Sequence, residues 1–180
     1  MRLFVTHMQD FTPLEWPIIS YYRQAVVERL CHSIGVNEYI LYVASQKCTR
    51  PNMRGKMLGF AKIMDRLVRH GAERYVNPEK IDEGCRRNGN FAWPFGVLIG
   101  EAKLLTNPQA AKPMIGPQFS KAPRGNFYIL QGRDQVSRIL ELECNPVDMG
   151  EAYQPPNNTT PAGRRLAASR RDIPPRRDSR

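Results

Sequence analysis

An aromatic stretch followed by a Glu-x-Lys pair holds the side chains of this chain that could do chemistry. Phe91, Trp93 and Phe95 alternate, so in an extended segment their rings fall on one face. Aromatic faces stack on unpaired bases and form the walls around an extruded base. Glu101 and Lys103 also share a strand face, and such a pair can carry metal-dependent phosphodiester hydrolysis. The segment therefore predicts either nucleic-acid binding or nucleic-acid cleavage.

Cleavage requires more than the Glu101-x-Lys103 pair. Nucleases of the PD-(D/E)xK group use such a strand, in which the acid binds Mg²⁺ and the lysine assists the attacking water. They also need an upstream carboxylate, and Asp82 is the plausible one here. However, no strand pattern follows Asp82, and a Glu–Lys pair on a sheet surface needs no catalytic role. Cleavage by Asp82, Glu101 and Lys103 is therefore the second hypothesis.

A basic stretch between two predicted strands offers contacts to phosphate. Residues 45–56 contain four cations with short hydrogen-bonding side chains among them. This mixture is typical of a loop that contacts a nucleic-acid backbone, although an exposed hairpin can carry the same charges only for solubility. A functional loop should lie beside the aromatic segment. The candidate residues are Ser45, Gln46, Lys47, Arg50, Arg54 and Lys56.

The charge of the whole chain favours an anionic partner. The formal net charge is +10, from 27 Lys+Arg against 17 Asp+Glu. Residues 151–180 hold seven arginines against three acids, a net +4, which leaves +6 for residues 1–150. Nucleic acid, either DNA or RNA, is the commonest anionic partner of such a protein. A protein-interaction module with a basic tail is the third hypothesis.

The remaining composition narrows the class of protein. The four cysteines and three histidines have no metal-ligand spacing, and no phosphate-binding glycine loop occurs, so we expect no metal and no cofactor. Apolar runs are too short for a membrane span or a secretory signal, which predicts a cytoplasmic protein without membrane contact. A break near Gly150 separates a domain at 1–150 from a Pro- and Arg-rich tail at 151–180, which should be disordered.

Hydrophobic patterns predict an α+β domain. Strands linked by short segments favour antiparallel pairing, and the glycines Gly55 and Gly59 suggest a bend or a close approach of two backbones. We therefore expect a small curved sheet or pseudo-barrel with packed helices. The predicted strands are 3–7, 39–44, 55–64, 97–105 and 126–130, and the predicted helices are 17–33, 78–89 and 135–143.

Two short motifs resemble the PUA-like superfamily, closest to its EVE and ASCH branches. The stretch 55–63 fits a GxxxGxAxI strand through its two glycines, Ala61 and Ile63, and Trp93-Pro94-Phe95 fits an aromatic-Pro-aromatic turn before a strand. The resemblance covers residues 38–130 and implies a pseudo-barrel that binds RNA or a modified DNA base without catalysis. The N-terminus departs from it, because a long helix is predicted where an EVE domain begins with a strand.

Together these patterns favour a non-catalytic domain that accommodates a modified or unstacked base in an aromatic-walled pocket. Trp93 and Phe95 are the first candidates for stacking on the base. Tyr42 and Tyr128 are weaker candidates for the same role. Ser45, Gln46 and Asn126 would offer hydrogen bonds to a base edge, and the cations of residues 45–56 would contact phosphates.

Overall fold

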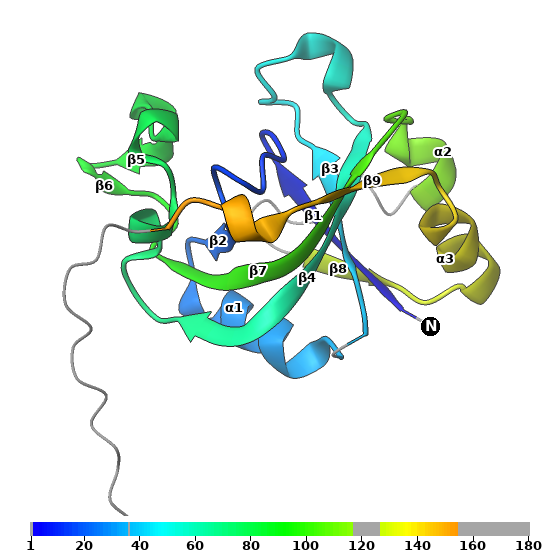
Figure 1. Cartoon of the computed structure of the whole chain (residues 1–180), viewed down its shortest axis with the longest axis horizontal. Helices are drawn as coiled ribbons and strands as arrows, with labels where there is room; N and C mark the ends of the chain where they lie inside the picture. Colours follow the sequence, from blue (N-terminus) through cyan, green and yellow to red (C-terminus); the bar gives the residue numbers. More distant parts are fainter. Residues whose placement is uncertain (1, 36, 117–126, 155–180) are drawn as a thin grey trace, which may run out of the picture.

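A curved seven-stranded sheet forms the centre of the fold (Figure 1). The computed structural model describes residues 2–35, 37–116 and 127–154. Along the sheet the strands follow the order β2-β7-β4-β3-β1-β8. β9 pairs with the same edge of β7 as β2 does, but farther along that strand. The strands are β1 (Leu3–Met8), β2 (Ile18–Tyr21), β3 (Ile40–Ala44), β4 (Met57–Val68), β7 (Phe95–Leu105), β8 (Phe127–Leu130) and β9 (Cys144–Val147).

The sheet is mixed and open. The predicted antiparallel pairing is confirmed for β3 with β4 and for β4 with β7. By contrast, β1 pairs with β3 in parallel, because the chain passes through β2 and helix α1 (Gln24–Ser33) before it returns beside β1. Within the described ranges β2 and β8 end the strand order without pairing with each other. The α+β class is thus confirmed, and the sheet does not close into a barrel there.

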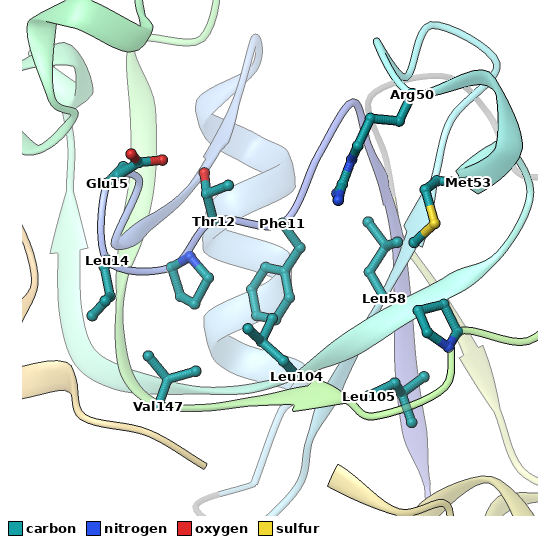
Figure 2. A pocket seen from close by; sticks show the side chains of 12 residues that line it. Phe11, Thr12, Leu14, Glu15, Arg50, Met53, Leu58, Leu104, Leu105 and Val147 are labelled. Atoms are coloured by element: carbon teal, nitrogen blue, oxygen red, sulfur yellow. The ribbon is translucent and has the colours of Figure 1, made fainter. Parts of the chain in front are cut away.

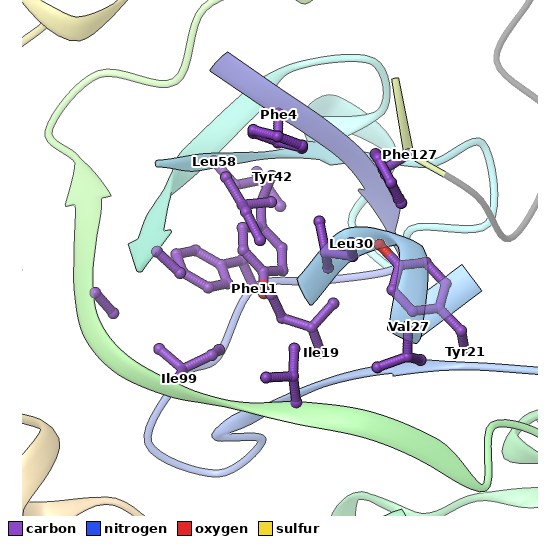
Figure 3. Close-up of a cluster of buried hydrophobic side chains, with 14 of the residues drawn as sticks. Phe4, Phe11, Ile19, Tyr21, Val27, Leu30, Tyr42, Leu58, Ile99 and Phe127 are labelled. Atoms are coloured by element: carbon purple, nitrogen blue, oxygen red, sulfur yellow. The ribbon is translucent and has the colours of Figure 1, made fainter. Parts of the chain in front are cut away.

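Each face of the sheet buries its own hydrophobic cluster. On the concave side, Val27 and Leu30 of α1 pack against Phe4, Ile19 and Tyr42 from three strands (Figure 3). On the other side, α2 (Ala111–Ile115) and α3 (Arg133–Leu140) cover a second cluster. The second cluster includes Leu3, Val5, Leu41, Val43, Phe60, Val136 and Ile139. Alternate residues of β1 and β3 thus enter opposite clusters, as the pleat of a strand requires.

A third cluster covers the end of the sheet where β7 begins. It combines Ile18 and Val68 from the sheet with residues of short turns and of the β5–β6 hairpin. The turns are the 3₁₀ helices η2 (Ala72–Tyr75), η3 (Pro78–Lys80) and η4 (Glu83–Cys85), and the hairpin strands are β5 (Arg86–Arg87) and β6 (Asn90–Phe91).

Two predicted helices are wrong in part or whole. The first begins at Gln24 instead of Pro17, because residues 18–21 form β2 and are fully buried against β7. The helix predicted at 78–89 is instead η3, η4 and the β5–β6 hairpin. Asn77 and Asp82 cap these two turns, accepting hydrogen bonds from the Glu79 and Cys85 backbone N–H groups. The third predicted helix corresponds to α3, and β9 and α2 were not predicted.

The two glycines before and within β4 do what their spacing predicts. Gly55 has a φ of 72°, a left-handed conformation that suits the turn before the strand. A Cβ at Gly59 would lie 2.2 Å from the Lys103 backbone oxygen and 2.8 Å from the Phe11 ring. The neighbouring strand and the core therefore approach where only glycine fits.

The domain continues beyond the predicted break at Gly150. Ala152 is buried, and the Tyr153 N–H donates a 2.7 Å hydrogen bond to the Leu14 carbonyl. The rest of the predicted tail, residues 155–180, lies outside the described residues, as does Asn126. No helix in the described ranges has the length and apolar content that crossing a membrane requires.

Candidate nucleic-acid interface

The β4–β7 ladder separates the two sets of residues that were predicted to share one pocket. At one end Gly59 is opposite Leu104, and residues 45–56 precede this end, which we call the loop end. At the other end Val68 is opposite Gly96, next to Phe95 and the β5–β6 hairpin, and we call it the hairpin end. At about 3.3 Å per residue, the strand spans roughly 30 Å between them. The two sets therefore do not meet (Figure 1).

Most of the predicted aromatic wall belongs to the core of the hairpin end. The rings of Trp16, Phe91 and Trp93 form a triangle, with centroid distances of 5.7 to 6.1 Å. Phe91 is buried and Trp93 is partly buried in this triangle. Phe95 is partly buried, with its ring 6.0 Å from that of His70 in an edge-on arrangement. Phe95 also packs against the hydrophobic cluster on the concave side of the sheet, so none of these three rings is fully exposed.

An exposed tyrosine lies at the end of β2, at the hairpin end. Tyr21 pairs with Phe95 in the sheet, so Tyr22 follows directly at the end of β2. The Tyr22 side chain is 53% exposed, the most of any large hydrophobic residue in the described part of the chain. The Arg87 guanidinium lies 5.3 Å from the Tyr22 ring centroid. This cation–π contact joins the β5–β6 hairpin to the sheet.

Exposed arginines lie on the segments that adjoin this contact, Arg23 directly after Tyr22 and Arg86 directly before Arg87. Across the described residues none of them forms an ion pair, and the one side-chain hydrogen bond is a 3.4 Å contact from Arg86 to the Gly89 carbonyl. Among the nearby acids, Asp82 already caps η4 through the Cys85 N–H. We call Tyr22, Arg23, Arg86 and Arg87 the arginine–tyrosine surface.

Two of the four cations of the loop end, Arg50 and Arg54, have partners within the protein. Arg50 forms an ion pair with Asp10, and Arg54 Nε donates a 3.2 Å hydrogen bond to the Cys48 carbonyl. Ser45 Oγ accepts from the Lys47 N–H at 3.2 Å, which stabilises the local turn. Lys56 is partly buried, and its backbone bridges to Ala110. In this part of the structure the side chains of Gln46, Lys47 and Lys56 have no hydrogen-bond or ion-pair partner.

A groove of about 440 Å³ opens beside the loop end (Figure 2). Of the predicted site residues, it contains Arg50, which extends along one wall opposite Phe11. The rest of the lining is mainly apolar and includes Leu14, Leu58 and Leu104. The groove thus offers little hydrogen bonding to a base edge.

Of the two weaker tyrosine candidates, Tyr42 is buried and Tyr128 is partly buried. Tyr42 is buried, and its ring stacks on that of Phe11 at 4.0 Å between centroids (Figure 3). Burial raises the pKa of Tyr42 well above 10, and its hydroxyl has no hydrogen-bond partner in the described structure. Tyr128 lies on the α3 side of the sheet, 6.2 Å from the His7 ring, and burial raises its pKa as well. The Tyr42 ring is therefore closed to a base, and the partly buried Tyr128 ring lies on the α3 side, away from the hairpin end.

Glu101 and Lys103 form part of a polar cluster on the sheet. Lys62 Nζ lies 2.9 Å from Glu101 Oε2, and Lys103 Nζ lies 3.3 Å from Glu101 Oε1. The Tyr39 hydroxyl donates to Glu101 at 2.7 Å and accepts from Lys103 at 2.9 Å. The hydrogen bond from Lys62, followed by that from Tyr39, lowers the pKa of Glu101 to about 2. The carboxylate is therefore ionised and already held by three donors.

The second acid of the cleavage hypothesis is in another part of the fold. Asp82 caps η4 at the hairpin end, whereas Glu101 interacts with Lys62, Tyr39 and Lys103 in the middle of the ladder. Among the described residues, no group of three or more His, Cys, Asp or Glu side chains could hold a metal ion. The described geometry thus offers no support for a two-carboxylate Mg²⁺ site.

Comparisons with known proteins do not identify a family for this chain. The chain matches no family model, and no curated protein or solved structure matches it. The resemblance to PUA-like domains therefore stays a prediction.

Sequence reasoning missed the two residues at the centre of the exposed surface, Tyr22 and Arg87. Asn88 and Gly89 adopt φ values of 52° and 77° in the turn between β5 and β6. An Asn-Gly pair between two short extended segments is a strong hairpin signal. Reading that signal would have placed Arg86 and Arg87 on an exposed strand.

Proposed function

We propose that this protein binds single-stranded nucleic acid, without catalysis, through the arginine–tyrosine surface. The observation that carries the proposal is the 53% exposed Tyr22 ring with the Arg87 guanidinium 5.3 Å from its centroid. An exposed ring among cations that lack acidic partners combines a stacking platform with phosphate contacts. The net charge of +10 favours the same class of partner.

In this proposal each side chain of the surface has a separate role. Arg87 covers part of the Tyr22 ring and orients it, while the exposed remainder of the ring stacks on an unpaired base. The surrounding arginines contact the phosphates on either side of the stacked base. The resemblance to PUA-like domains also predicts binding of an unstacked base.

Removing the Tyr22 ring tests the stacking role. In Tyr22→Leu we expect about tenfold weaker binding of a mixed-sequence 12-nucleotide strand, because a stacked base contributes roughly 1–3 kcal/mol. Fluorescence anisotropy on labelled DNA and RNA strands at fixed salt measures the dissociation constant. Tyr22→Phe retains the ring and is the matched control, with an affinity within twofold of the original chain. Equal binding by Tyr22→Leu would show that the ring does not stack on a base.

A second measurement separates binding from cleavage and from a protein-interaction role. The same strands, incubated with the protein and Mg²⁺, should remain intact. Cleavage that disappears in Glu101→Ala would overturn the non-catalytic proposal. Binding should weaken steeply with added salt, because phosphate contacts release counterions. A chain that retains neither DNA nor RNA at low salt would contradict nucleic-acid binding altogether.

A further inference from the structure

A second hollow lies on the α3 side of the sheet, away from the arginine–tyrosine surface. It has a volume of about 450 Å³ and lies between the β4–β7 ladder, the C-terminal end of α3 and β9. This volume falls within the range of roughly 300–1,000 Å³ that is typical of small-molecule sites. Its lining residues are Tyr39, Phe60, Lys103, Leu140, Leu142, Cys144 and Pro146.

Most of this lining is apolar. Phe60 is buried, and the Tyr39 ring meets it edge-on, with 6.1 Å between centroids. Leu140 and Leu142 extend the apolar lining where α3 ends. The Cys144 thiol donates a 3.2 Å hydrogen bond to the Leu142 carbonyl, and burial raises the pKa of this thiol. The wall thus suits an apolar ligand body and offers no reactive thiolate.

Lys103 is the cation among these lining residues. Lys103 Nζ donates to the Tyr39 hydroxyl at 2.9 Å and contacts Glu101 at 3.3 Å. An ammonium group has three N–H donors, so one remains for a ligand, and the side chain is 38% exposed. The hydrogen bond that Lys103 donates to Tyr39 is the first cause that raises the pKa of Lys103, so the group stays charged at neutral pH.

The charges around Lys103 favour an anion. Lys62 Nζ lies 4.6 Å from the Tyr39 ring centroid and 2.9 Å from Glu101, so one carboxylate neutralises two ammonium groups only in part. Glu143 is exposed beside Cys144 and is not part of the lining. The cluster of Tyr39, Lys62, Glu101 and Lys103 therefore carries one uncompensated positive charge at the rim of an apolar hollow.

We infer that this hollow is a binding site for a small amphipathic anion, with the ligand carboxylate on Lys103 and its apolar body along Phe60 and Leu142. The Tyr39 hydroxyl and Glu101 hold the lysine in place, so the cation is positioned before the ligand arrives. This site is independent of nucleic-acid binding, because none of its lining residues belongs to the arginine–tyrosine surface.

Octanoate is a suitable probe, because it combines a carboxylate with a short apolar chain. Titration into the isotope-labelled full chain, followed by two-dimensional amide NMR, should give saturable shifts at Tyr39, Lys103 and Cys144. Octylammonium, which has the same apolar chain and the opposite charge, should bind at least tenfold more weakly. Equal binding of the two probes, or no saturable shift with octanoate, would overturn the proposal.

Two variants test the assigned contacts. Lys103→Gln retains a hydrogen-bonding side chain without the charge and should raise the octanoate dissociation constant about tenfold. Leu142→Glu places a second carboxylate in the hollow and should abolish octanoate binding. Lys80→Gln is the matched control, because Lys80 is also an ion-paired surface lysine, 2.9 Å from Glu15, outside the lining. An unchanged dissociation constant in Lys103→Gln, with the NMR spectrum of a folded chain, would contradict the role of Lys103.

Discussion

The hairpin end and the loop end are both rich in cations, but they use them differently. At the loop end, Arg50 is paired with Asp10 and Arg54 is bonded to the Cys48 carbonyl. At the hairpin end, Arg87 lies beside the exposed Tyr22 ring, and no acid pairs with it among the described residues. Two stretches of similar composition therefore differ in how much of their charge is available to a partner.

A stretch of sequence that is rich in cations therefore does not always provide cations that are free to bind a partner. A cation that already donates to a carboxylate or a carbonyl must exchange that partner for a phosphate, so its net contribution to binding falls. A guanidinium beside an aromatic ring keeps most of its donors available. We therefore expect the hairpin end to dominate binding, and the comparison can be tested at both ends of the same ladder.

The largest expected effect concerns two glycines, one at each end of the ladder. Gly59→Ala should lower the free energy of unfolding by about 3 kcal/mol, because its Cβ would lie 2.2 Å from the rigid Lys103 carbonyl oxygen. Gly96→Ala should cost about half as much. There the Cβ would lie 2.7 Å from the Ile19 carbonyl oxygen and 2.8 Å from the flexible Ile18 side chain. Urea denaturation measures both.

Gly35→Ala is the control for these two variants. Its Cβ would meet the Glu38 side chain at 3.4 Å, which is an ordinary contact, so the change should stay within about 0.5 kcal/mol. A Gly59→Ala protein as stable as the Gly35→Ala protein would mean that β4 and β7 do not approach so closely at the loop end.

The next effect concerns the two sets of cations. Replacing Arg86 and Arg87 together by Gln should weaken binding of the 12-nucleotide strand about tenfold and reduce the salt dependence of the affinity, because two phosphate contacts are lost. Replacing Arg50 and Arg54 together by Gln removes the same charge at the loop end and should change the affinity by less than threefold, because both guanidinium groups already have partners within the protein. Anisotropy titrations at several salt concentrations measure both.

These double variants are each other's controls, because each lowers the net charge by two. Equal losses at both ends would mean that only total charge matters. A larger loss at the loop end would reverse the comparison and move the interface to residues 45–56.

The smallest expected effects concern two buried tyrosines, one paired across the sheet with the loop end and one with the hairpin end. Tyr42 is opposite Gly59, and Tyr42→Phe should stabilise the protein by about 1 kcal/mol, because its buried hydroxyl has no partner in the described structure. Tyr21 is opposite Phe95, and its hydroxyl is 3.1 Å from that of Thr6. Tyr21→Phe should cost about 1 kcal/mol, because it leaves the Thr6 hydroxyl buried and unpaired. Thermal unfolding measures both, and shifts of the same sign would contradict this account.

The strands that could be predicted from sequence were those with a strong local signal. β3 and β7 are runs of β-branched, aromatic and aliphatic residues, and both lie where their composition indicates. β2 was missed because Ile19 and the residues after it also fit the spacing of a helix face. Its extended conformation depends on pairing with β7, far away in the chain, and no local pattern encodes that contact.

The candidate site was less predictable, for a similar reason. The charge of residues 45–56 was visible, but the pairing of Arg50 with Asp10 joins residues 40 positions apart. The aromatic spacing of Phe91 and Trp93 was also visible, whereas their burial depends on Trp16. Tertiary contacts thus decide which cations and rings remain exposed, and these contacts cannot be predicted from composition alone.

The position of β1 between β3 and β8 sets an order for assembly during synthesis. Thr6 pairs with Phe127, so about 120 residues must be added before β1 gains its second neighbour. At roughly 5–20 residues per second, this takes on the order of 10 s. During that interval one edge of β1 is open to other chains. A nascent chain therefore exposes a strand that the finished fold encloses on both sides, and slower translation would lengthen that exposure.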